Sequence, residues 1–196
     1  MDSRGECRNF DGKVSEESIQ FVVVMGVTGC GKSTLGRALA LALGWDFLEG
    51  DAFHGPLNLA KIVRGEVLTD LDRLPWLERL AHEIRLREAS GRCAVLACSA
   101  LKESYRDLLR EASKRLAFVH PNASEERIAE RLLHRVGHFA DGRRLPSQYA
   151  VLEPCPDALP LDAFLPVGDQ VVRVVEALGL APRATAELTG EGLRSL

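Results

Sequence analysis

Four residues near the N-terminus have the types and the spacing to hold phosphate groups. Gly26, Gly31, Lys32 and Ser33 fill the pattern G-x-x-x-x-G-K-[ST] within the stretch MGVTGCGKST. In this pattern the glycines let backbone N–H groups turn toward phosphate oxygens, the lysine reaches the β- and γ-phosphates, and the hydroxyl holds Mg²⁺. The pattern therefore predicts a nucleotide site. Its expected residues are Gly26, Val27, Thr28, Gly29, Cys30, Gly31, Lys32, Ser33 and Thr34.

A second group that could do chemistry is the acid pair Glu49 and Asp51. They lie two residues apart on an expected strand, so both side chains point to the same face. They also end that strand, and ligands of open α/β sheets bind at the carboxyl ends of strands. A carboxylate there can accept a hydroxyl proton or bind Mg²⁺ through water. The alternative is a pair of solvated acids at a strand end.

The elements that must position these residues alternate between strands and helices. Apolar runs at 19–27, 45–51, 93–100, 116–121 and 158–164 predict buried strands. Helical spacing marks 35–44, 75–91, 104–114, 124–135 and 168–179. The alternation predicts an α/β fold with a central parallel sheet of about five strands. Right-handed connections would place helices on both of its faces. Residues 50–77 have the composition of a polar loop that ends in a helix start.

Length and composition favour a single domain with polar ends. We expect a polar N-terminal extension at 1–18, one domain at 19–180 and a polar tail at 181–196. No run approaches the roughly 18 apolar residues that span a bilayer, and a net charge of -3 gives no reason to expect nucleic acid. Five cysteines without C-x-x-C spacing argue against a disulfide framework and a zinc site. A reduced, cytoplasmic compartment is the simplest interpretation.

Three further stretches, together with the phosphate loop, resemble the small P-loop gluconokinases. The stretch at 50–77 is similar to that family's G-D-x-x-H, then Asn, Lys and Gly, then L-x-D-x-D-R-x-P-W-L. The stretch at 97–110, ACSALKESYRDLLR, resembles C-S-A-L-K-x-x-Y-R-D. The stretch at 131–154 resembles R-L-x-x-R-x-G-H-F, a spacer, S-Q and L-E-P. The four motifs occur in the family's order, and the resemblance extends from about residue 21 to about 178.

This resemblance implies a P-loop kinase fold of the shikimate kinase and adenylate kinase type, with a lid segment. It implies ATP-dependent phosphorylation of D-gluconate to 6-phospho-D-gluconate, with Mg²⁺ as cofactor and a homodimer as assembly. The implied catalytic residues are Lys32, Asp51 and Arg135, and Arg131 joins the phosphate loop in binding ATP. Substrate binding falls to Asp51, His54, Arg73, Lys102, Arg106 and His138. Metal binding falls to Ser33 and Glu49.

The sequence departs from the family pattern mainly in the acceptor loop and the lid. Gly55 and Val67 stand where the family usually has proline, Glu49 stands where aspartate is usual, and Ala140 and a basic pair, Arg143 and Arg144, occupy the lid spacer. Two alternatives therefore stay open. One is a kinase for another small polyol or hydroxy acid, such as shikimate. The other is a non-catalytic regulator that binds a nucleotide. A GTPase is disfavoured because the chain has no NKxD-like motif and no DxxG motif after the third expected strand.

Overall fold

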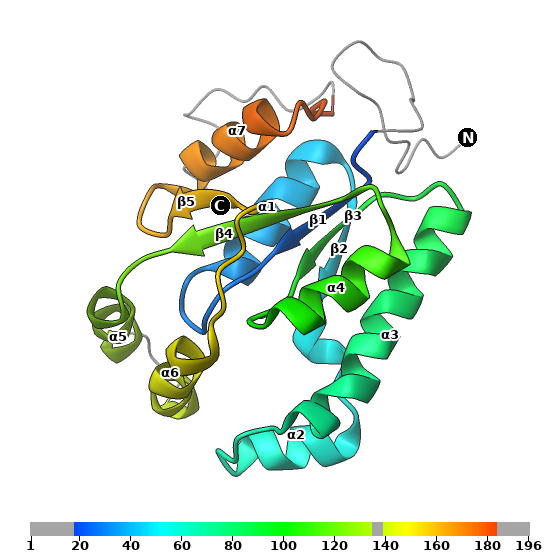
Figure 1. Cartoon of the computed structure of the whole chain (residues 1–196). Coiled ribbons are helices and arrows are strands. Elements are labelled where there is room, and N and C mark those ends of the chain that lie inside the picture. The colour runs from blue at the N-terminus through cyan, green and yellow to red at the C-terminus, as the bar shows by residue number, and fades with distance from the viewer. Residues whose placement is uncertain (1–17, 135–138, 184–196) are drawn as a thin grey trace.

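The centre of the molecule is a sheet of five parallel strands. The structure, a computed structural model, describes residues 18–134 and 139–183. The strands lie in the order β2-β3-β1-β4-β5 (Figure 1). They are β1 (Phe21–Val24), β2 (Asp46–Glu49), β3 (Ala94–Ala97), β4 (Leu116–Asn122) and β5 (Leu159–Asp162). Because β1 is central, the phosphate loop that follows it leaves from the middle of the sheet's carboxyl edge. The expected α/β fold is confirmed.

Two helices cover each face of the sheet (Figure 1). On one face, α1 (Lys32–Leu43) and α7 (Val167–Ala177) pack against Val22 and Val24 of β1. On the other face, α3 (Asp70–Ala89) and α4 (Glu103–Ala112) pack against Phe21 and Val23. Successive β1 residues thus enter opposite cores, as the twofold period of a strand requires. This explains why the run is apolar throughout instead of alternating.

The stretch at 50–77 is mostly helical, which composition did not predict. It contains the 3₁₀ helix η1 (Gly50–Phe53), then α2 (Pro56–Val63), and then the first turns of α3. Pro56 begins α2, where its fixed φ suits the first turn and its missing N–H costs nothing. Thr69 caps α3 through a capping box with Asp72. These local signals set the helix ends, and the polar composition concealed them.

The lid segment also contains a helix that the sequence did not predict. After α5 (Glu125–Leu133), the helix α6 (Phe139–Val151) covers most of the spacer between the G-H-F and L-E-P motifs. Pro146 lies inside α6. Proline inside a helix removes one backbone donor, so sequence reasoning favours a loop there. In Figure 1, α5 and α6 lie together beyond the carboxyl ends of β1 and β4.

The cysteines are not all reduced, contrary to expectation. Cys30, Cys98 and Cys155 are free thiols, whereas Cys93 is disulfide-bonded. Burial raises the pKa of Cys98 to about 12, so this thiol stays protonated and unreactive.

None of the helices in the described ranges is both long enough and apolar enough to cross a membrane.

Candidate active site

The phosphate loop joins β1 to α1 and places Lys32 and Ser33 in the first turn of α1. Gly31 caps this helix with φ 99°, a left-handed conformation that glycine adopts without steric cost. The N-terminus of α1 offers unpaired backbone N–H groups and the positive end of the helix dipole, which together favour an anion. The Lys32 Nζ donates to the Val27 carbonyl at 2.8 Å. The ammonium group is thus held at the loop's own edge.

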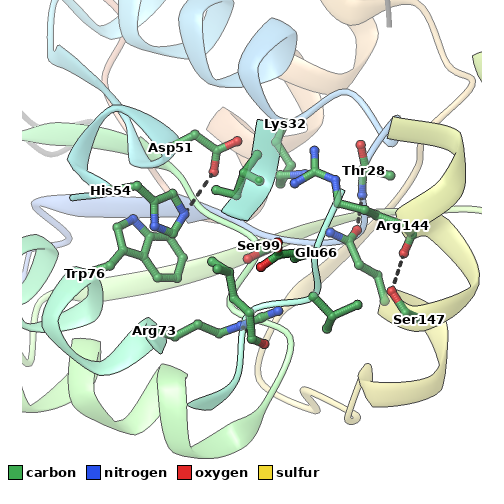
Figure 2. Close-up of a pocket in the computed structure, with 14 residues that line it drawn as sticks. Thr28, Lys32, Asp51, His54, Glu66, Arg73, Trp76, Ser99, Arg144 and Ser147 are labelled. Atoms are coloured by element: carbon green, nitrogen blue, oxygen red, sulfur yellow. Dashed lines mark hydrogen bonds and ion pairs between the residues drawn. The ribbon is translucent and has the colours of Figure 1, made fainter. Parts of the chain in front are cut away.

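One pocket brings the phosphate loop together with residues from five other parts of the chain (Figure 2). We call it the junction pocket. Thr28 and Lys32 line it from the loop, and Asp51 lines it from η1. The remaining lining residues come from the η1–α2 and α2–α3 segments, the end of β3, and α6: His54, Ile62, Glu66, Val67, Leu68, Arg73, Trp76, Ser99, Arg144, Ser147 and Gln148. Two carboxylates, several cations and three small hydroxyl groups therefore face one space.

Close packing against the sheet fixes the position of η1. A Cβ atom on Gly50 would lie 2.4 Å from the Ala97 carbonyl oxygen, so only glycine fits at this point. The buried Trp76 indole donates its Nε1–H to the Gly50 carbonyl at 2.7 Å. These two contacts tie η1 to β3 and α3. The Asp51 side chain consequently stands 77% exposed at the pocket edge, while that of His54 is only 5% exposed.

His54 is a buried, neutral partner in this pocket. Its ring stacks on Trp76 with centroids 4.4 Å apart and planes 18° from parallel. Burial lowers the pKa of His54, and Asp51, whose Oδ1 lies 4.0 Å from Nε2, partly offsets that effect. At neutral pH the imidazole is therefore mainly uncharged. It can exchange a hydrogen bond with a hydroxyl group but does not contribute a cation.

The α2–α3 segment is held as one rigid unit by Asp72. The Asn58 side chain donates to the Asp72 carbonyl at 2.6 Å, and Lys61 pairs with the Asp72 carboxylate at 2.7 Å. Hydrogen bonds from Lys61 and Thr69 lower the pKa of Asp72 to about 2. The carboxylate thus stays ionised throughout the physiological range. Residues 64–68 connect these two helices, and part of this connection lines the junction pocket. Because the helices at both of its ends are held together, the position of the connection is fixed.

A second pocket also borders the phosphate loop. It is lined by Gly29, Gly31, Thr34, Leu35, Arg131, Leu132, His134, Ala163, Leu165, Val167 and Gln170. Arg131 donates to the Gly29 carbonyl at 3.3 Å and to the Ala163 carbonyl at 2.7 Å. Its guanidinium carbon lies 3.8 Å from the centroid of the Phe164 ring. The structure therefore places Arg131 beside the phosphate loop.

Two of the expected substrate cations do not line the junction pocket. The Lys102 Nζ bonds both carboxylate oxygens of Asp70, at 2.7 and 2.8 Å, and the Tyr105 hydroxyl donates to the same group at 2.5 Å. This cluster joins the N-terminus of α3 to that of α4. Arg106 is even less accessible to a substrate, because its side chain is completely buried.

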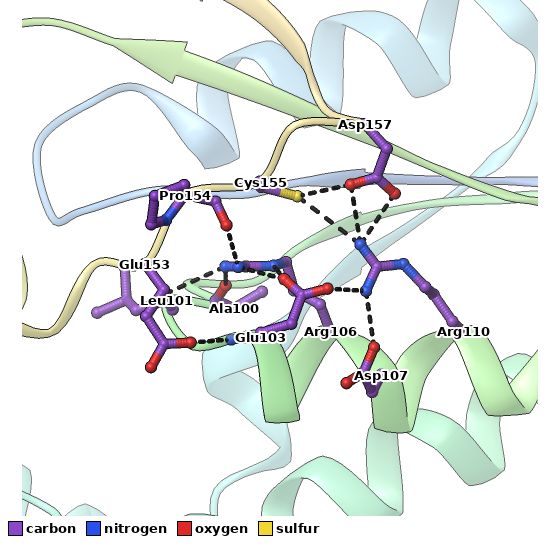
Figure 3. A network of polar contacts seen from close by, with 10 residues as sticks. All are labelled: Ala100, Leu101, Glu103, Arg106, Asp107, Arg110, Glu153, Pro154, Cys155 and Asp157. Atoms are coloured by element: carbon purple, nitrogen blue, oxygen red, sulfur yellow. Dashed lines mark hydrogen bonds and ion pairs between the residues drawn. The ribbon is translucent and has the colours of Figure 1, made fainter.

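Arg106 joins three segments through all three of its side-chain nitrogens (Figure 3). Nη1 donates to the carbonyls of Ala100 at 3.0 Å and Leu101 at 3.1 Å, and Nη2 donates to that of Pro154 at 2.6 Å. Nε donates to the Glu103 carboxylate at 2.8 Å. Ala100 has φ 42°, an uncommon value for a residue with a Cβ atom. The guanidinium thus joins the strained turn after β3 to Pro154, which follows α6.

Loss of Arg106 should destabilise the whole protein. Arg106→Met leaves buried carbonyls without a donor, and we expect the free energy of unfolding to fall by about 3 kcal/mol or more. Urea unfolding followed by circular dichroism measures this. The matched control is Arg110→Met, since Arg110 is one turn further along α4 and pairs with exposed acids. That loss should be about 1 kcal/mol or less. Equal, small losses in the two variants would mean that Arg106 is not a structural clamp.

The remaining expected site residues have separate positions. Ser33 is half-buried at the start of α1. Glu49 Oε2 lies 3.4 Å from Arg37 Nη2, and Glu49 is not among the residues that line the junction pocket. Arg73 does line it, with Nε donating to the Leu68 carbonyl at 3.3 Å. Arg135 and His138 lie outside the described residues.

Comparison with known proteins agrees with this geometry. Residues 21–155 match the sequence model of a family described as AAA domain. The gluconokinase of Gluconobacter oxydans (strain 621H) is 49% identical over 134 residues, which cover 68% of this chain and 75% of that protein. The chain belongs to the gluconokinase family.

Solved structures give the same family placement. A gluconokinase from Sinorhizobium meliloti 1021 is 42% identical, with a TM-score of 0.73 over 83% of this chain and 91% of that one. A sugar kinase from Janibacter sp. HTCC2649 is also 42% identical, with a TM-score of 0.79 over 84% of this chain and 96% of that one. The resemblance found in the sequence is thereby confirmed.

Sequence reasoning missed several residues of the junction pocket. Glu66, Arg144, Ser147 and Gln148 line it, although no role was expected for any of them. Two signals were available. Ser147 and Gln148 form the S-Q pair of the gluconokinase pattern, and Arg144 belongs to the basic pair in the lid spacer. Val67, another departure from the family pattern, also lines the pocket. The departures thus concern the acceptor side directly.

Proposed function

We propose that this protein transfers the γ-phosphoryl group of ATP to the 6-hydroxyl of D-gluconate. The observation that carries the proposal is the junction pocket, in which Lys32, Asp51 and Arg73 face one space in a chain of the gluconokinase family. Phosphoryl transfer needs little covalent chemistry from a protein. It requires the two substrates to be aligned and the transferring charge to be neutralised.

On the donor side, the phosphate loop and Lys32 bind the nucleotide. The backbone N–H groups at the start of α1 hold the phosphates, and the adjacent pocket containing Arg131 receives the rest of the nucleotide. Lys32 donates to the Val27 carbonyl. It exchanges this neutral carbonyl for the stronger, charge-assisted contact with the β- and γ-phosphates. Its charge then follows the transferring group.

On the acceptor side, Asp51 orients the reacting hydroxyl and accepts its proton. Its carboxylate is exposed at the pocket edge and shares the pocket with Lys32, which supports a role between donor and acceptor. Arg73 supplies a cation for the gluconate carboxylate, and a guanidinium suits this task because it can bind both oxygens at once. Neutral His54 completes the set as a partner for a hydroxyl group.

The residues present fit a magnesium ion bound mainly by the nucleotide. Mg²⁺ in kinase sites keeps several waters and takes few protein ligands beside phosphate oxygens. No group of three or more His, Cys, Asp and Glu side chains in the described part of the chain could hold a metal by itself. We assign the Ser33 hydroxyl to the ion and Glu49 to a contact through water. When bound, the ion neutralises phosphate charge.

A panel of acceptors tests the proposed reaction. Purified protein with Mg-ATP should release ADP when gluconate is added. Glucose, which lacks the carboxylate, and shikimate, which has a different ring geometry, should produce much less ADP. A coupled assay for ADP measures all three, and 6-phosphogluconate is identified by mass spectrometry. Equal rates across the panel, or activity with shikimate alone, would overturn the gluconate assignment.

Two expectations from the family complete the proposal. A cytoplasmic location fits the use of ATP and a phosphorylated sugar acid. A homodimer is the expected assembly, and light scattering at assay concentration measures it. A monomer that is fully active would remove the dimer from the proposal.

A further inference from the structure

Gln148 connects the lid helix to the phosphate loop. Its Oε1 accepts a hydrogen bond from the backbone N–H of Thr28 at 2.6 Å, across 120 positions of sequence. Both residues line the junction pocket. In Figure 2 the dashed line that starts at Thr28 marks this bond. Gln148 thus occupies a backbone donor of the very loop whose amides serve phosphate.

This bond also fixes which way the Gln148 carboxamide points. A backbone N–H can only donate, so the side-chain oxygen must face Thr28. The other branch of the amide, Nε2, carries two N–H donors and no acceptor. It therefore pairs only with oxygens such as those of a hydroxyl, carboxylate or phosphoryl group. Sugar acids and phosphates present such oxygens in abundance.

The location of Thr28 indicates which ligand the Nε2 group of Gln148 could contact. Thr28 is the loop residue that shares the junction pocket with Lys32, Asp51 and Arg73. A group bonded to its N–H therefore lies where the transferring phosphoryl meets the acceptor. We propose that Gln148 bridges the two substrates' sites, with Oε1 on the Thr28 N–H and Nε2 donating to an oxygen of bound gluconate. This inference rests on the proposed function and adds an acceptor-contacting residue to it.

The helix that carries Gln148 is anchored on both sides. The hydroxyl of the neighbouring Tyr149 donates to the Ala123 carbonyl at 2.8 Å, and Leu145 is buried. At the exit of α6, the Glu153 N–H donates to the Leu101 carbonyl at 2.8 Å. Such anchoring reduces the entropy that would be lost when the amide is held against a ligand. The Tyr149 contact also supplies a control. Tyr149→Phe removes the hydrogen bond to Ala123 and loosens α6 without altering the bond between Gln148 and Thr28.

Two substitutions separate the halves of the bridge. Gln148→Glu keeps an oxygen for the Thr28 N–H but replaces the Nε2 donor with an acceptor. Gln148→Ala removes both contacts. We expect both variants to lose kcat/KM for gluconate by about 10-fold to 100-fold, on the scale of a misplaced substrate or a lost preorganised donor. The KM for ATP should change far less, and Tyr149→Phe should stay near the parent.

Hydrogen exchange of the ligand-free protein tests the bond between Gln148 Oε1 and the Thr28 N–H without measuring turnover. The Thr28 amide should exchange faster in Gln148→Ala than in the parent, and at the parent rate in Gln148→Glu and Tyr149→Phe. Mass spectrometry of peptides covering 25–34 measures this. The combination of protected Thr28 and impaired gluconate use in Gln148→Glu is the decisive result, since a general loosening of the lid cannot produce it.

The possible failures are distinguishable. If the parent turns over gluconate and both Gln148 variants match its kcat/KM, the acceptor contact is wrong while the proposed function stands. If Tyr149→Phe reproduces the losses of Gln148→Ala, Gln148 acts only through lid packing and the inference is overturned. If the parent releases no ADP with gluconate, the proposed function fails and the acceptor contact fails with it.

Discussion

Lys32→Ala is expected to reduce gluconate-dependent turnover by about 10²-fold or more, the scale for removing one preorganised charge contact from a transition state. The reason is that Lys32 carries the loop's only side-chain cation within the stretch 25–34. Its ammonium is bonded to the Val27 carbonyl, and Lys32 lines the junction pocket, where we propose that transfer occurs. Steady-state kinetics with ATP and gluconate varied separately measure the effect, which should fall mainly on kcat.

The control for this variant is Lys61→Ala. Lys61 is also a half-buried lysine, but it pairs with Asp72 in the α2–α3 unit. Its loss should affect the KM for gluconate more than kcat. Circular dichroism and binding of a non-hydrolysable ATP analogue establish that Lys32→Ala remains folded. A near-parental kcat in a folded Lys32→Ala protein would show that the phosphate loop is not the catalytic centre.

Asp51→Asn should lower turnover by about 10²-fold to 10⁴-fold, the usual contribution of a positioned general base. Asparagine retains the size of the side chain and most of its hydrogen bonding but has neither the charge nor the basicity. The Asp51 side chain is 77% exposed, so the substitution should leave the fold intact. Affinity for ATP, measured by calorimetry, should change much less than kcat.

The matched control is Glu49→Gln, the other acid at the end of β2. Glu49 contacts Arg37 and not the junction pocket, so its loss should shift the dependence on Mg²⁺ and leave the maximal rate closer to the parent. Asp51→Asn also has an internal check. Asp51 raises the pKa of His54, so its neutralisation should lower that pKa further, as an NMR titration of His54 measures. An Asp51→Asn protein that turns over gluconate at the parental rate would exclude Asp51 as the base.

The sheet and the phosphate loop were predictable because their signals are local. Runs such as 19–27 are apolar on both faces, and G-x-x-x-x-G-K-[ST] implies a strand before it and a helix after it. The acceptor side was harder to predict because its geometry is tertiary. The ends of α2 and α3 depend on Pro56, Thr69 and Asp72, single residues within a polar stretch.

Arg106 illustrates the limit of reasoning by residue type. A cation in a family motif after β3 was a reasonable partner for a carboxylate. Nothing in the spacing reveals that the chain returns 48 residues later and places the Pro154 carbonyl against the same guanidinium. Gln148 was missed for the opposite reason. Its place in the S-Q pair marked it, but the chemistry of a neutral amide does not indicate which group it contacts, and the structure supplies that partner, Thr28.

The Asp72-centred unit has a consequence for the evolution of acceptor choice. Asn58 and Lys61 join α2 to the start of α3, and Thr69 and Asp72 cap α3. The residues between these two groups therefore contribute little to the stability of the fold. The five residues at 64–68 can therefore be exchanged as a cassette. Glu66, Val67 and Leu68 line the pocket from this cassette, while Lys32 and Asp51 belong to other elements. A new acceptor could thus be selected by substitutions in one short connection, and the phosphate-transfer machinery would be inherited unchanged.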